Sequence, residues 1–212
     1  MRLYLPLSRR SVLAGSAALG AFALSAGRGA FAAGIDIETA MSRRFLGDEN
    51  APLKMIEFFS LGCPHCRTFH EESLPVIKEE FIDTGKVQIE FRDYPLGIKA
   101  TAAAMITRCA PPDRYHGLVT LMFRSQAKWA QVENSLPPLK TVAKFGGLSG
   151  DDVEACLNNS ALLSAIRTRA EADQSEYGVE STPTFIIGPD RRKLVGANSP
   201  DVFRDVLNEE LG

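Results

Sequence analysis

The chain has 212 residues, of which 45 % are hydrophobic and 24 % charged, values that fit a folded domain and exclude a collagenous, disordered or low-complexity chain. The whole chain has a formal net charge of −2, and residues 33–212 alone carry 20 basic and 26 acidic groups, a net charge of −6. An acidic chain without a basic stripe is a poor partner for nucleic acid or for an anionic membrane.

Residues 1–32 are predicted to be an export signal that is cleaved after Ala32. Three arginines precede an apolar stretch over residues 12–26, and no acidic residue occurs before Asp36. Residues 8–13 (Ser-Arg-Arg-Ser-Val-Leu) resemble a twin-arginine signal, with an ordinary secretory signal or a membrane anchor as the alternatives. Either export route predicts a bacterial protein outside the cytoplasm, in the periplasm.

The first half of a fold is predicted over residues 51–97, after a polar N-terminal arm at 33–50. Residues 53–60 form a nearly continuous apolar run, which indicates a strand buried on both faces. A helical pattern follows, and Pro75 is expected to kink it. Strict alternation over residues 87–92 indicates a second strand, parallel to the first because the helix is a crossover.

An all-helical insertion is predicted over residues 98–177. Within it, Ser149 and Asp152 indicate a capping box, and Ser160 is expected to cap a longer helix that stops at Gly178. The second half of the fold, residues 178–212, is predicted to be two strands joined by a turn and then a helix. The fold class is therefore α/β, in the order βαβ, helical insertion, ββα.

The run Cys63-Pro64-His65-Cys66 lies where the first strand gives way to a helix. Only a thiolate attacks a disulfide, and the N-terminus of a helix favours an anion because its N–H groups are unpaired. Cys63 is therefore predicted to be an exposed nucleophile and Cys66 a buried resolving thiol. His65 adds a cation or a donor, and stabilising the reduced state in this way makes the disulfide a better oxidant.

Other uses of the same four residues fit less well. A zinc site needs a second close ligand pair, and Cys109 and Cys156 are isolated from each other. Haem attachment needs a histidine where Arg67 stands. No metal or other cofactor is expected, and redox catalysis is the preferred interpretation over a plain structural disulfide.

Residues 57–60 (Glu-Phe-Phe-Ser), the pair at 63–66 and residues 181–185 (Ser-Thr-Pro-Thr-Phe) together resemble the DsbA-like branch of the thioredoxin-like superfamily. That branch consists of periplasmic dithiol oxidases. The resemblance covers the chain from about residue 45 to the C-terminus. It implies a thioredoxin fold with a helical insertion between its two halves.

The resemblance also implies roles for single residues. Pro183 would follow a cis peptide bond and face the cysteine pair, although a proline that merely begins a strand is the alternative. Thr182 would present its backbone to a substrate chain as an added strand. Glu57 matches the buried acid of the family, where burial would raise its pKa and let it exchange a proton with Cys66; the alternative is an exposed polar residue. His70 is expected to face solvent.

Cys109 and Cys156 are predicted to form a second disulfide, because the compartment is oxidising and the cysteine count is even. Some DsbA-like proteins of alphaproteobacteria resemble this chain in having such a pair. Two separate buried thiols are the alternative.

The predicted function is oxidation of reduced exported proteins by a monomeric enzyme, through exchange at Cys63 and Cys66. The resemblance implies reoxidation by a quinone-linked membrane partner of the DsbB type. A disulfide isomerase or reductase of the same fold remains an alternative, because Thr182 is a residue type also seen in isomerase-like relatives. A thiol-based chaperone or a metal-handling protein is the rival from another class.

Overall fold

The computed structural model describes residues 34–212, and the predicted export signal lies outside these residues. Five strands form one mixed sheet in the order β1-β3-β2-β4-β5, in which β2 and β3 are parallel and the other neighbours antiparallel. The α/β order of two halves separated by helices is confirmed. The strands are β1 (Arg44–Leu46), β2 (Leu53–Phe59), β3 (Val87–Asp93), β4 (Thr184–Ile187) and β5 (Arg192–Val195).

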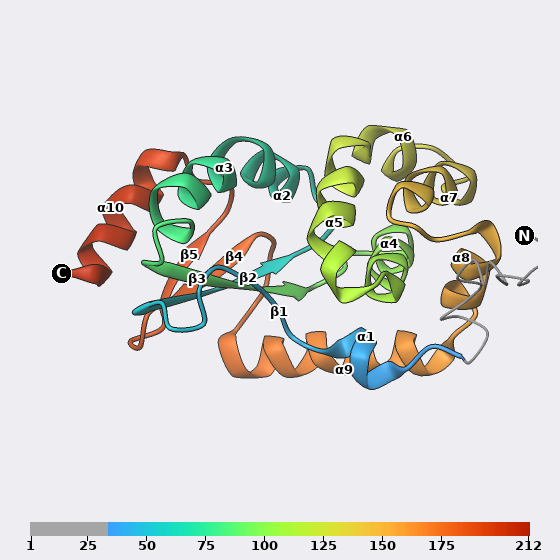
Figure 1. Ribbon diagram of the computed structural model, residues 1–212, viewed down its shortest axis with the longest axis horizontal. Coiled ribbons are helices and arrows are strands. Elements are labelled where there is room, and N and C mark those ends of the chain that lie inside the picture. The colour runs from blue at the N-terminus through green and yellow to red at the C-terminus, as the bar shows by residue number, and fades with distance from the viewer. Residues whose placement is uncertain (1–33) are drawn as a thin grey trace, which may run out of the picture. The chain divides into compact units, whose positions relative to one another are not determined.

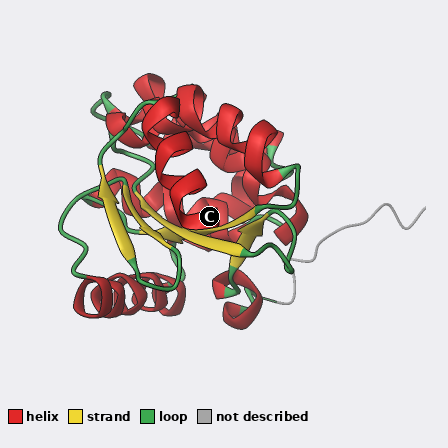
Figure 2. Ribbon diagram, turned by 90° about the vertical axis from the view of Figure 1, so that its left-hand side faces the viewer, coloured by secondary structure: helices red, strands yellow, loops and turns green. Residues whose placement is uncertain are grey.

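Helices cover both faces of the sheet (Figures 1 and 2). One face carries α2 (Pro64–Thr68), α3 (Leu74–Ile77) and α10 (Pro200–Leu211), and the other carries α9 (Ser160–Tyr177). The remaining insertion helices lie together beyond one end of the sheet: α4 (Ile98–Cys109), α5 (Tyr115–Arg124), α6 (Gln126–Ala130), α7 (Leu136–Phe145) and α8 (Gly150–Leu157). Within residues 34–212, no helix is long and apolar enough to cross a membrane.

Strand β2 is covered on both faces, as its apolar run predicts. The adjacent residues Phe58 and Phe59 point to opposite faces, and both are fully buried. Phe58 packs against Tyr177 of α9 with ring centroids 5.2 Å apart, and Phe59 packs against Phe123 of α5 at 6.0 Å. Truncating either ring to alanine would cost about 3–5 kcal/mol, so this strand anchors the core.

The helix after the cysteine pair contains two widened turns. π-helical turns at Phe69–Ser73 and Lys78–Ile82 alternate with α2 and α3. Pro75 has no N–H group, and its ring would meet the carbonyl of Glu71 in a regular α-helix. The turn just before Pro75 opens instead, and Leu74 donates to the carbonyl of Phe69. The disturbance predicted at Pro75 therefore takes the form of widened turns.

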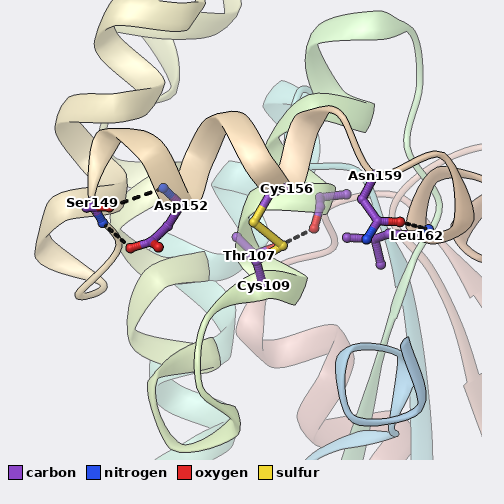
Figure 3. Close-up of a disulfide and its surroundings, with 8 residues drawn as sticks. Thr107, Cys109, Ser149, Asp152, Cys156, Asn159 and Leu162 are labelled. Atoms are coloured by element: carbon purple, nitrogen blue, oxygen red, sulfur yellow. Dashed lines mark hydrogen bonds between the residues drawn. A yellow bond between two sulfur atoms is a disulfide. The ribbon is translucent and has the colours of Figure 1, made fainter. Parts of the chain in front are cut away.

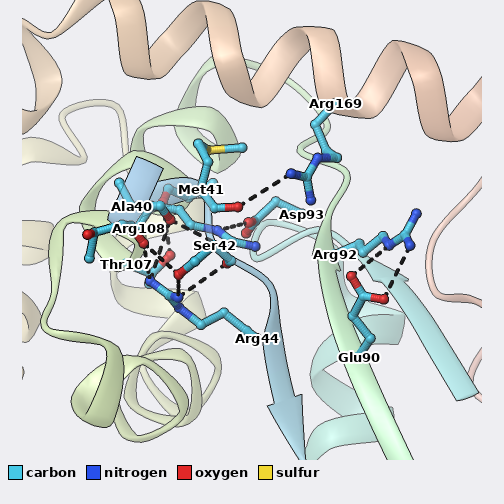
Figure 4. A network of polar contacts seen from close by, with 12 residues as sticks. Ala40, Met41, Ser42, Arg44, Glu90, Arg92, Asp93, Thr107, Arg108 and Arg169 are labelled. Carbon is cyan, nitrogen blue, oxygen red and sulfur yellow. Dashed lines mark hydrogen bonds and ion pairs between the residues drawn. The ribbon is translucent and has the colours of Figure 1, made fainter. Parts of the chain in front are cut away.

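The predicted polar arm contains two elements that its sequence did not indicate, namely helix α1 (Ile37–Met41) and edge strand β1. Both are held by buried arginines (Figure 4). Arg108 of α4 pairs with Asp93 and donates to the carbonyl of Ser42 at 2.8 Å, while Arg44 donates to the carbonyl of Thr39 at 3.1 Å. Long-range polar contacts thus fix a segment whose own pattern is weak.

The helix caps of the insertion match the sequence in part. Ser149 and Asp152 form the predicted capping box of α8, with bonds of 3.1 and 2.7 Å (Figure 3). The predicted cap at Ser160 is wrong: the cap of α9 is Asn159, whose side chain accepts from the N–H of Leu162 at 2.9 Å. The helix thus begins one residue earlier than predicted, because asparagine and serine are both good N-cap residues and it is the carbonyl oxygen of Asn159 that reaches an unpaired N–H.

Candidate functional site

Cys63 and Cys66 sit at the start of the helix that leaves strand β2. Cys63 is the N-cap of α2 with extended backbone angles, and Pro64 occupies the first helical position. Cys63 is half-buried, whereas Cys66 is 0 % exposed, and both are free thiols. The N–H of Ser60 lies 3.4 Å from the sulfur of Cys66. One thiol is therefore open to attack and the other is sealed beneath it.

The two thiols differ in acidity. The pKa of Cys63 is lowered to about 5, first by the hydrogen bond from the Cys66 thiol, and further by the backbone N–H groups of Cys66 and His65. Burial raises the pKa of Cys66 well above its ordinary value. At pH 7 a pKa near 5 corresponds to about a hundred thiolates for each thiol at Cys63. The pair thus contains a nucleophile that is ionised at neutral pH.

The reactivity of Cys63 should report this acidity directly. Alkylation of the reduced protein by iodoacetamide is expected to follow a single titration with a midpoint near pH 5, because only the thiolate reacts. The rate should be flat above about pH 7. Denaturing the protein should move the midpoint to about 8.5, the value of a free cysteine. A midpoint above 7 in the folded protein would contradict the assignment of the nucleophile.

Thr182 and Pro183 face the pair from the other half of the fold. The peptide bond between them is cis, and the carbonyl oxygen of Thr182 lies 3.3 Å from the sulfur of Cys63, which donates to it when protonated. The hydroxyl of Thr182 is buried and has no hydrogen-bond partner within residues 34–212. The backbone carbonyl group of Thr182 is thus placed directly beside the nucleophile.

Glu57 lies in β2, the middle strand of the sheet, and its charge, after burial and the hydrogen bond with Cys63, helps to raise the pKa of Cys66. It is 0 % exposed and stands between Phe91 of β3 and Phe185 of β4 in the strand register. Nε2 of His70 lies 3.0 and 3.1 Å from its two carboxylate oxygens. The structure therefore does not place Glu57 on an exposed edge, and it gives this acid a histidine partner.

The expectation that His70 faces solvent is wrong, because its side chain is only 5 % exposed. Residues four apart on a helix share a face, and His70 follows Cys66 by four. The buried side of the helix is therefore the side that both residues occupy. This spacing was visible in the sequence and could have placed His70 beside the pair.

Gln126 is a site residue that the sequence did not indicate. Its side chain is buried, and its amide nitrogen donates to the carbonyls of Leu61 at 2.7 Å and Cys63 at 2.9 Å. These carbonyls lie on either side of Gly62, so the helical insertion fixes the backbone just before the nucleophile. Gly62 itself fits closely, since a Cβ there would lie 3.1 Å from the Cβ of Ala100.

Cys109 and Cys156 form a disulfide between α4 and α8, inside the insertion (Figure 3).

The remaining two histidines are His116 of α5 and His65 of α2. A ring nitrogen of His116 lies 2.9 Å from the carbonyl oxygen of Phe45, and the His116 ring packs against Phe91 with centroids 5.0 Å apart. His65 is exposed on α2. Among residues 34–212, no group of three or more His, Cys, Asp and Glu could hold a metal ion.

Comparison with known proteins agrees with this geometry. The model of the thioredoxin family matches residues 39–209. A putative protein-disulfide oxidoreductase of Rickettsia conorii is 26 % identical over 143 residues, which cover 67 % of this chain and 52 % of that protein. The chain thus spans about half the length of this curated relative.

Solved structures cover the chain more fully. The crystal structure of Wolbachia pipientis alpha-DsbA1 is 31 % identical, with a TM-score of 0.74, over 81 % of this chain and 92 % of that one. A protein-disulfide isomerase from Novosphingobium aromaticivorans is 27 % identical, with a TM-score of 0.68, over 80 % and 97 % of the two chains.

Proposed function

The chain belongs to the DsbA-like branch of the thioredoxin family, and from this premise we propose that it is a periplasmic enzyme that oxidises cysteine pairs in other exported proteins. The observation that carries the proposal is the unequal acidity of Cys63 and Cys66. A stabilised Cys63 thiolate favours the reduced state of the pair, so the disulfide state readily accepts two electrons.

The exchange proceeds in two displacements. A substrate thiolate attacks the sulfur of Cys63, the bond between Cys63 and Cys66 breaks, and Cys66 leaves with the electron pair and takes up a proton. A second substrate thiolate then attacks the substrate sulfur of the mixed disulfide, and Cys63 leaves as a thiolate. The substrate loses two electrons and gains a disulfide, while the enzyme ends with one thiolate and one thiol.

The surface beside Cys63 suits an unfolded substrate. Ser60 accepts from the N–H of Leu96 at 3.1 Å, which holds the loop before α4 next to the active-site strand. Leu96 of this loop is half-exposed, and Ile98, the first residue of α4, is 89 % exposed. Exposed apolar side chains of this kind mark interaction sites. An extended substrate can contact them while its backbone pairs with Thr182.

The role is tested by incubating the oxidised protein with a reduced, unfolded protein substrate and following the loss of substrate thiols. We expect stoichiometric oxidation, and we expect the pair to remain largely reduced in a glutathione buffer that would oxidise thioredoxin. A quinone-linked membrane oxidase of the DsbB type would then reoxidise Cys63 and Cys66.

The isomerase alternative is separated by two further measurements. Gel filtration should show a monomer, and the protein should reactivate scrambled ribonuclease poorly. A dimer with strong isomerase activity, or a pair as reducing as that of thioredoxin, would overturn the proposal in favour of the isomerase or reductase alternative.

A further inference from the structure

An open groove lies among α5, α6 and α7 of the helical insertion, helices that stand together beyond one end of the sheet (Figure 1). Its volume is about 360 Å³, which falls within the range of pockets that hold a ligand. Val142 is only 8 % exposed and lies at its floor, whereas Phe145 is 76 % exposed and stands at its rim. Four apolar side chains line the groove: Leu121, Pro138, Val142 and Phe145. An exposed apolar recess of this kind marks an interaction site.

The groove carries positive charge in an otherwise acidic chain. Arg124 and Lys128 line it, both are exposed, and neither forms an ion pair within residues 34–212. Residues 115–148 contain four basic residues and one acidic residue, a net charge of +3, whereas the chain from residue 33 onward carries −6. Two free cations beside an apolar recess are complementary to a ligand that is both apolar and acidic.

We propose that this groove is a docking site for an acidic, amphipathic segment of the proteins that the enzyme oxidises. The inference rests on the proposed function and deepens it, because it names a feature of the substrate outside its cysteine pair. In this mode of recognition, a helix lays its apolar face into a groove. Apolar side chains of the segment fill the recess over Val142, and its carboxylates pair with Arg124 and Lys128.

The shape of the groove favours a protein segment over an anionic lipid surface. A helix that lies on a membrane buries a continuous apolar stripe of its own among the lipids. Here the apolar residues come from two helices, α5 and α7, and they surround a recess. A flat bilayer surface reaches Phe145 at the rim but not Val142 at the floor, whereas single side chains of a peptide enter the recess.

Helix α6 connects the groove to the cysteine pair. Ser125 and Lys128 line the groove, while Gln126 points to the active-site loop. There its amide nitrogen donates to the carbonyls of Leu61 and Cys63. The groove and Cys63 therefore lie on different sides of one short helix, and a helix with its side chains is about 10–12 Å across. A segment seated in the groove holds the rest of its own chain near Cys63, which raises the effective concentration of the substrate thiols.

The test compares three synthetic peptides, each with the same reduced cysteine pair followed by a Gly-Ser linker of about 15 residues. Such a linker spans about 20 Å on average, more than the width of a helix. The first peptide continues into a helical segment with leucines along one face and glutamates on both flanks. The second has lysines in place of the glutamates, and the third ends after the linker. We expect the oxidised protein to oxidise the acidic peptide about tenfold faster, in second-order rate constant, than either other peptide. Salt at about 0.5 M should remove this advantage, because it screens exposed charges.

Charge variants locate the effect. Arg124→Glu with Lys128→Glu should abolish the advantage of the acidic peptide, because like charges then face each other. Phe145→Ser should reduce it by removing the apolar rim. The matched control is Lys86→Glu with Lys193→Glu, which makes the same change in net charge at exposed positions outside the insertion and should keep the full advantage. Fluorescence anisotropy of the acidic segment alone, without cysteines, measures docking directly.

Four results would overturn the proposal. The acidic and basic peptides could be oxidised at equal rates, or the advantage could survive charge reversal at Arg124 and Lys128. The acidic segment could bind in the anisotropy measurement without faster oxidation, which would exclude a substrate as the occupant. Vesicles of anionic lipid could bind the wild type where the segment does not, which would assign the groove to a lipid surface. Oxidation of the third peptide by wild type tests the proposed function separately, so failure of the docking site leaves that function standing.

Discussion

Replacing Cys63 with serine is expected to reduce disulfide transfer to the rate of the uncatalysed reaction. The thiol is the accessible member of the pair and carries a pKa of about 5, whereas a serine hydroxyl is not ionised at neutral pH and cannot form a disulfide. The measurement is the loss of thiols from a reduced substrate protein, with the variant in molar excess.

The matched variant is Cys66→Ser, which should behave differently. In that variant, Cys63 can still attack a disulfide of a substrate protein. No second thiol is present, however, to release the substrate from the mixed disulfide. A mixed disulfide between enzyme and substrate should therefore accumulate and be visible on a non-reducing gel. Undiminished oxidation by Cys63→Ser, or adducts formed through Cys66 instead, would contradict the assigned order of attack.

Removing the second disulfide should cost stability and spare activity. In the chain-entropy model, a crosslink between cysteines 47 residues apart contributes about 4 kcal/mol to the free energy of unfolding. The double variant Cys109→Ala with Cys156→Ala is therefore expected to lose about that amount in urea denaturation. The bridge joins α4 to α8 within the helical insertion, so the rate of exchange should be unchanged.

The comparison requires both proteins to have Cys63 and Cys66 in the same redox state. A single variant, Cys109→Ala, adds a control because it leaves an unpaired thiol at Cys156. Equal stability of the double variant and wild type would show that the bridge does not restrict the unfolded chain. A large loss of exchange activity would show instead that the packing within the insertion determines the geometry of the cysteine pair.

The strands and helices with strong local patterns could be predicted from the sequence. The apolar run of β2, the alternation of β3 and the turn between β4 and β5 each reflect contacts made along the whole element. Strand β1 has three residues and pairs with the distant strand β3, and helix α1 has five residues and accepts a hydrogen bond from the buried side chain of Arg108. Pattern reading fails there because the stabilising contacts come from residues far away in the chain.

The site residues also divide into those that the sequence could predict and those that it could not. Cys63, Cys66 and the stretch around Pro183 could be located from residue types and spacing. His70 carried a readable signal in its distance from Cys66, but a polar residue between glutamates and arginine suggests a solvated helix face. Gln126 carried none, because a glutamine in a helical block has no special spacing, and its two acceptors are backbone carbonyls 65 and 63 residues away.

That distance has a consequence for how the protein is made. The carbonyl of Cys63 is bound by Gln126, 63 residues later, and the sulfur contacts Thr182, 119 residues later. A nascent chain that has not yet reached these residues lacks both contacts around Cys63. The surroundings of Cys63 are therefore completed only after both the helical insertion and the second half of the fold have been synthesised.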